Sequence, residues 1–186
     1  AMLIQAVIGK IVVDTLLSPV LITIHMIVAL LIVGLLIYLL YEVLPADTRY
    51  VNKGKLSQMA FALIILTLVQ VGLGTQVRQF VDHQVDLFGY PLSSQWLENG
   101  PIIFFIHRSF SVILTILHLW FFYLAIKKWK HPVKSYYTLG ILILTTILSG
   151  ILMNYVDFPF GSQAAHLVTA SLILGLQFYI WMRLRS

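Results

Sequence analysis

Long apolar runs separated by short polar segments set the pattern of this chain. Five runs approach or exceed the roughly 20 residues that a helix needs to cross a bilayer: 18–44, 56–79, 101–126, 135–155 and 163–182. Residues 1–13 form a further apolar run that is too short to span. Because prolines, glycines and charges bound these sustained runs, they predict helices rather than barrel strands. The expected fold class is therefore an all-α polytopic membrane protein.

The composition agrees with this class. The 186 residues are 60% hydrophobic and only 10% charged, whereas about a quarter of the residues in a soluble domain are charged. The absence of cysteine excludes disulfides, thiolate metal sites and iron–sulfur clusters. The net charge of +5 does not indicate nucleic-acid binding, because the basic residues lie in short loops between apolar runs, where they mark topology.

The distribution of charge predicts which ends of the helices face the cytoplasm. Basic residues gather in segments 45–55 and 127–134 and at the C-terminus, whereas segments 80–100 and 156–162 are acidic and lack lysine. The positive-inside rule places the first set in the cytoplasm and the second outside. His25, His107 and His166 each lie within a few residues of the outer end of a span. Three separate helices thus bring one histidine each to the same depth.

Two short patterns recur along the chain. A glutamine is followed four residues later by a glycine at Gln5 and Gly9 and again at Gln70 and Gly74, and sixteen residues separate Gly9 from His25 and Gly150 from His166. These matches predict that residues 1–44 end an N-terminal helical half and that residues 57–184 are a complete four-helix copy of it. Copies with an even number of spans share one orientation. On this interpretation residues 1–13 are the tail of a span, and the first copy's counterpart of His107 is absent from the sequence.

An ionisable residue within a membrane segment indicates a functional site. One histidine from each of two helices, here His107 and His166, suits a haem iron bound on both axial sides of a four-helix bundle. Each imidazole must be neutral and oriented through its other nitrogen. The sequence offers Ser109, Gln163, Asn154 or a backbone carbonyl for that role and does not select among them.

Other residues near these histidines suit the rest of a haem. Arg78 and Arg108 lie near the same outer ends, and the planar fork of arginine suits paired carboxylates such as haem propionates. They could equally contact lipid phosphates. Glycines 72, 74 and 150 would let a flat ring approach the helix backbones.

Simpler roles for the histidines stay open at this point. A histidine at a helix end is usually an interfacial residue bonded to water or a carbonyl. His118 follows His107 by eleven residues, which returns to nearly the same helix face about 16 Å deeper. It is either a hydrogen-bonded core histidine or the ligand of a second haem, and no second histidine lies at its depth on another span.

The order of these motifs resembles the haem A synthases, a family of cytochrome oxidase assembly enzymes. The resemblance rests on Gly74-Thr75-Gln76-Val77-Arg78 closing a span, His107-Arg108 opening the next and His166 opening the last. These match the second half of the family, and residues 3–25 resemble the end of its first half. Many members carry a cysteine pair in the outer loops, and segment 80–100 has none.

The resemblance implies an oxidoreductase with two similar four-helix halves. The reaction converts a methyl group of haem O to the formyl group of haem A for cytochrome oxidase. His107 and His166 would ligate haem b, with Arg78 and Arg108 at its propionates. His25 would belong to the substrate-side half as a catalytic ligand of the second haem iron. Its counterpart histidine falls on helices outside this sequence, so activity of this chain alone is not expected.

The same resemblance implies surroundings and partners. We expect a multi-pass protein of the bacterial cytoplasmic membrane, in contact with lipid, an unidentified electron donor, and haem O synthase or other oxidase assembly factors, and able to form a homo-oligomer. Two other functions remain open: a membrane cytochrome b that only transfers electrons, with ligation at His118, and a haem-free assembly factor.

Overall fold

The computed structural model describes residues 2–15, 18–43, 54–89, 96–97, 100–128 and 134–185. Its elements are six α-helices and one π-helical turn: α1 (Met2–Asp14), α2 (Pro19–Val43), α3 (Gly54–Phe88), α4 (Ile102–Tyr123), η3 (Leu124–Lys128), α5 (Lys134–Tyr155) and α6 (Ser162–Arg185). Five of these helices, α2 to α6, are long and apolar enough to cross a membrane. The prediction of an all-α, multi-pass membrane protein is confirmed.

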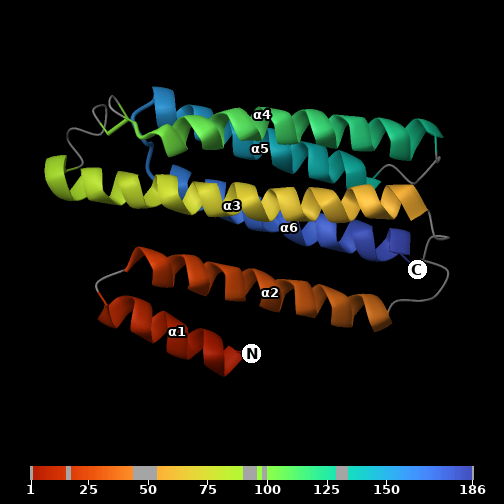
Figure 1. Cartoon of the computed structure of the whole chain (residues 1–186), viewed down its shortest axis with the longest axis horizontal. Coiled ribbons are helices and arrows are strands. Elements are labelled where there is room, and N and C mark those ends of the chain that lie inside the picture. The colour runs from red at the N-terminus through yellow and green to blue at the C-terminus, as the bar shows by residue number, and fades with distance from the viewer. Residues whose placement is uncertain are drawn as a thin grey trace.

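Helices α3 to α6 form a four-helix bundle (Figure 1). Helix α3 packs on α4 and α6, and α5 packs on α6, so α4 and α6 face each other across the bundle. Helix α2 packs mainly on α6, and α1 packs on α2. The proposed division into residues 1–44 and 57–184 stays a prediction.

Successive helices alternate in direction. Helices α2, α4 and α6 run in one direction and α1, α3 and α5 in the other (Figure 1). Lys55, Lys127, Lys134 and the two arginines that end α6 therefore lie at one end of the bundle. The opposite end contains the first turns of α2, α4 and α6.

The tightly packed apolar core lies toward the basic end. Its buried members come from the first part of α3, the middle and end of α4 with η3, the start of α5 and the middle and end of α6: Leu56, Ala60, Leu63, Leu114, Phe121, Ala125, Tyr136, Leu139, Ile173, Ile180 and Leu184. A smaller cluster of Leu30, Ile64 and Leu174 joins α2 to the bundle. The bundle is thus anchored at the end opposite the three histidines.

Helix α3 is longer than the sequence indicated. Its apolar run was expected to end at Gln79, followed by a polar loop from residue 80, but the helix continues to Phe88. Polar residues such as Asp82, His83 and Asp86 do not break a helix, whereas Gly89 adopts a positive φ of 67° that glycine accepts readily at a helix C-terminus. At 1.5 Å per residue the 35 residues measure about 52 Å, so α3 extends well beyond a hydrocarbon core of about 30 Å. Glu98 lies outside the described residues.

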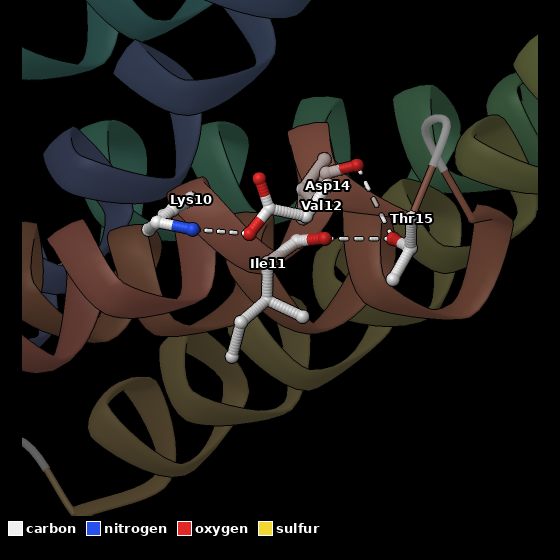
Figure 2. Close-up of polar contacts among 5 residues, drawn as sticks. All are labelled: Lys10, Ile11, Val12, Asp14 and Thr15. Atoms are coloured by element: carbon white, nitrogen blue, oxygen red, sulfur yellow. Dashed lines mark hydrogen bonds and ion pairs between the residues drawn. The ribbon is translucent and has the colours of Figure 1, made fainter.

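Helix α1 ends in a local polar arrangement. Lys10 forms an exposed ion pair with Asp14 one turn later, and the hydroxyl of Thr15 donates to the carbonyls of Ile11 and Val12 (Figure 2). Carbonyls at a helix C-terminus lack partners within the helix. The carbonyl of Ile11 also accepts the backbone N–H of Thr15 at 3.0 Å, whereas the Thr15 hydroxyl gives the carbonyl of Val12 a partner.

Candidate functional site

His107 and His166 lie close together across the bundle. His107 is on the second turn of α4 and His166 on the second turn of α6. Their ring centroids are 6.4 Å apart, with an angle of 59° between the ring planes. The equal depth inferred from the sequence therefore corresponds to direct proximity of these two imidazoles.

Ser149 on α5 orients the ring of His166. Its Oγ donates to the carbonyl oxygen of Thr146 at 2.8 Å and lies 2.9 Å from Nδ1 of His166. A serine hydroxyl has one proton, so when it donates that proton to Thr146 it accepts from Nδ1–H of the imidazole. His166 is thereby held as the tautomer with its lone pair on Nε2, which is the state that a metal ligand needs.

Each of the three histidines packs against a glycine on the preceding helix. A Cβ atom added at Gly74 would lie 3.1 Å from Cε1 of His107, and one added at Gly9 would lie 3.2 Å from Cε1 of His25. The corresponding distance from Gly150 to His166 is 3.5 Å. Glycine therefore allows the imidazole edge to approach the neighbouring backbone at all three positions.

Glutamines on α1 and α3 reach the backbone of the histidine-bearing helices. Nε2 of Gln70 donates to the carbonyl oxygen of His107 at 3.0 Å, and Nε2 of Gln5 donates to that of His25 at 3.1 Å. Gln5 also lies 3.1 Å from Nε2 of His25. Nδ1 of His25 and Nδ1 of His107 are buried without a hydrogen-bond partner. The Gln and Gly positions of the two similar patterns, Gln5 with Gly9 and Gln70 with Gly74, thus contact His25 and His107 respectively.

The two arginines occupy different positions. Arg78 is one helical turn beyond Gly74 on α3, half-exposed, with its Nε 3.4 Å from a carboxylate oxygen of Asp82. It therefore lies on the face of α3 that meets His107 and nearer the outer end. Arg108 is exposed on α4, about 100° around the helix from its neighbour His107.

Comparison with known protein families identifies the family of this chain. Residues 1–178 match the family described as cytochrome oxidase assembly protein, the family of the haem A synthases. The chain belongs to this family. Neither a curated protein nor a solved structure matches it. A role in cytochrome oxidase assembly and haem A synthesis follows from membership.

The geometry of the His107 and His166 pair fits the haem that such a protein would hold. Two imidazoles that held one metal ion through bonds of about 2 Å each would have their ring centroids about 6 Å apart. The observed separation is 6.4 Å. Within the described residues no group of three or more metal-binding side chains occurs, and two axial ligands are all that a haem iron takes from the protein.

His118 is a hydrogen-bonded core residue in this synthase-family fold. Its Nδ1 lies 2.7 Å from the carbonyl oxygen of Leu114, and its Nε2 lies 2.5 Å from Nε2 of Gln177 on α6. Nδ1–H therefore donates, and Nε2 accepts from the amide. Both ring nitrogens are engaged, so this arrangement does not support His118 as the ligand of a second haem.

Several site residues were missed in the sequence. Ser149 contacts Nδ1 of His166, whereas the sequence had offered Ser109, Gln163, Asn154 or a backbone carbonyl for such a role. Its signal was available, because it precedes Gly150, the residue that the repeat had already aligned. Thr67 and Gln177 were also missed, since a lone polar residue in a long apolar run does not reveal its partner.

Proposed function

We propose that the protein is a haem A synthase that oxidises a methyl group of haem O to the formyl group of haem A, with haem b held between His107 and His166. The observation that supports this most directly is the Ser149 contact, which leaves the lone pair of His166 on Nε2. Family membership supports the reaction class. The spacing of the two imidazoles supports two axial ligands on one iron.

The chain's own residues have distinct roles in this proposal. His107 and His166 bind the iron, Ser149 holds the proton of His166 at Nδ1, and Gly74 and Gly150 set how closely each ring approaches its neighbouring helix. The bound haem b supplies one-electron redox chemistry.

The arginines would bind the haem propionates to different extents. Arg78 is the stronger candidate, because it lies one turn from the His107 contact and already engages a carboxylate. Arg108 is the second candidate, since its exposure directs it toward the rim of the site or toward lipid.

His25 would serve the substrate haem O rather than the resident cofactor. In this structure its Nε2 accepts a hydrogen bond from Gln5, so ligation would require the Gln5 amide to move away. We place the three histidines near the outer face of a bacterial cytoplasmic membrane, as the basic opposite end favours. The electrons would come from a separate donor.

Pyridine haemochrome analysis of the purified protein tests the resident haem. We expect haem b in the unmodified protein and its loss in His107→Ala and in His166→Ala. His83→Ala is the matched control, because His83 is exposed on the extension of α3, and it should keep the haem. Colourless unmodified protein, or retention of haem b by either axial variant, would contradict the proposal.

Extraction of haems from cells that produce the protein tests the reaction. In cells that make haem O but no haem A, the proposal predicts haem A when the cells produce a form that also carries the counterpart of His25. A cytochrome b that only transfers electrons would show haem b with unchanged haem O.

A further inference from the structure

The spacing of polar residues on α4 and α6 is the same. His118 follows His107 by eleven residues, and Gln177 follows His166 by eleven residues. Eleven residues correspond to about three helical turns and about 16 Å. Because α4 and α6 run in the same direction (Figure 1), the His118 and Gln177 pair lies beneath the His107 and His166 pair, nearer the basic end.

A single amide group joins three helices at this deeper level. Nε2 of Gln177 on α6 lies 2.5 Å from Nε2 of His118 on α4 and donates to Oγ1 of Thr67 on α3 at 2.9 Å. The three side chains are only 2–5% exposed. Because Nδ1 of His118 donates to its own helix, its Nε2 is available to accept. Both amide protons of Gln177 are thus used between helices.

These bonds restrict how α4 and α6 can be aligned. A shift of α6 by one residue would move Gln177 about 1.5 Å along the axis and rotate it by about 100°, which would break both bonds. The groups would then be buried without partners, which is unfavourable. Helices α4 and α6 pack mainly on other helices and, in the described part of the chain, share no large apolar contact. If the hydrogen bonds were lost, no such contact would hold these two helices in register.

We propose that Thr67, Gln177 and His118 form a clasp that sets the register and spacing of α4 against α6, and thereby positions His107 and His166. The clasp lies inside the anchored core, among Leu63, Leu114 and Ile173. The imidazole pair lies toward the opposite end of the same two helices. Because helices are rigid, the alignment fixed at the clasp also fixes the alignment of the two imidazoles. The effect on haem rests on the proposed function, whereas the effect on helix spacing does not.

The spacing can be measured without haem. The chain contains no cysteine, so His107→Cys with His166→Cys accepts nitroxide labels at two defined positions only. Dipolar broadening in continuous-wave EPR then reports the separation of α4 and α6 at the level of the site. We expect a single short separation with the clasp intact and its loss or dispersion on adding Gln177→Leu.

Further variants separate the clasp from general damage. Thr67→Val removes one bond with little change in volume and should give a smaller effect in the same direction. Exchanging the partners, as His118→Gln with Gln177→His, keeps a donor and an acceptor across the bundle and should restore the short separation. Thr115→Val is the matched control, because the Thr115 hydroxyl bonds only within α4, to the carbonyl of Ser111, and it should leave the separation unchanged.

Haem retention supplies the second measurement, in the protein with both histidines present. Interhelical hydrogen bonds in membranes average about 0.6 kcal/mol, a factor of about three each. Transfer of haem b to apomyoglobin should therefore be about tenfold faster in Gln177→Leu and about threefold faster in Thr67→Val. A colourless unmodified protein would overturn the proposed function and leave the EPR result to decide the clasp. An unchanged label separation in Gln177→Leu would overturn the clasp whatever the haem content.

Discussion

Replacing Gly74 with alanine tests the close packing of His107 against α3. The new Cβ would lie 3.1 Å from Cε1 of His107 and 3.7 Å from Nδ1. The first distance is below ordinary van der Waals contact, so either the imidazole or α3 must move by a few tenths of an ångström. Such overpacking costs about 1–3 kcal/mol.

The gain in helix propensity opposes this cost. Alanine is favoured over glycine inside a helix by about 1 kcal/mol, so Gly74→Ala should change stability by about 0–2 kcal/mol in the unfavourable direction. Gly72→Ala on the same helix is the matched control, because no atom lies within 4 Å of its new Cβ. It receives the propensity gain alone. The difference between the two variants, about 1–3 kcal/mol, therefore isolates the contact with His107.

Unfolding in mixed micelles of dodecylmaltoside and SDS, followed by circular dichroism, measures this difference. Gly150→Ala extends the series, since its Cβ would meet Cε1 of His166 at an ordinary 3.5 Å, and it should behave like Gly72→Ala. If Gly74→Ala proves as stable as Gly72→Ala, the reasoning that places the His107 ring edge against the α3 backbone is wrong.

The remaining predictions concern single polar or backbone contacts. Ser149→Ala leaves Nδ1–H of His166 without its acceptor and should weaken haem b binding by about 10–100-fold, measured by haem transfer to apomyoglobin; unchanged transfer would remove Ser149 from the site. Gln70→Leu loses the bond to the His107 carbonyl and should destabilise the protein by about 0.6 kcal/mol in the same micelle assay. Asp157→Gly relieves a left-handed backbone with φ of 52°, worth about 1–2 kcal/mol, against about 0.5–1 kcal/mol for the greater freedom of glycine in the unfolded chain. It should therefore stabilise the protein by about 0–1.5 kcal/mol; a clear loss of stability would show that the aspartate side chain has its own role there.

The positions of the spans were predictable because bilayer thickness fixes the length of an apolar run. The same constraint made the common depth of His25, His107 and His166 predictable. Because each span crosses the same bilayer, the number of residues between a histidine and the end of its span gives its depth. The end of α3 was not readable in this way. Outside the hydrocarbon region a helix can consist of polar residues, so the end of the apolar run does not mark the end of the helix. Helix α3 continues to Phe88 and ends before Gly89.

The partners across the bundle were not predictable from spacing. Which side chain of α5 contacts His166 depends on how the two helices are rotated about their axes. A long run of apolar residues on all faces does not indicate that rotation. Ser149 and Gln177 are both single polar residues in such runs. Only the three-dimensional packing shows that Ser149 contacts Nδ1 of His166 and that Gln177 joins α6 to α3 and α4.

The three histidines share a glycine contact but differ in the nitrogen that the protein occupies. At His166 the protein engages Nδ1 through Ser149 and leaves Nε2 for a metal. At His25 it engages Nε2 through Gln5, so any ligand of that nitrogen must first displace an amide. A resident cofactor requires a lone pair that is permanently available, whereas a substrate that binds and leaves can compete with a weak hydrogen bond at each turnover. This difference supports the proposal that His166 serves the haem that stays and His25 the haem that exchanges.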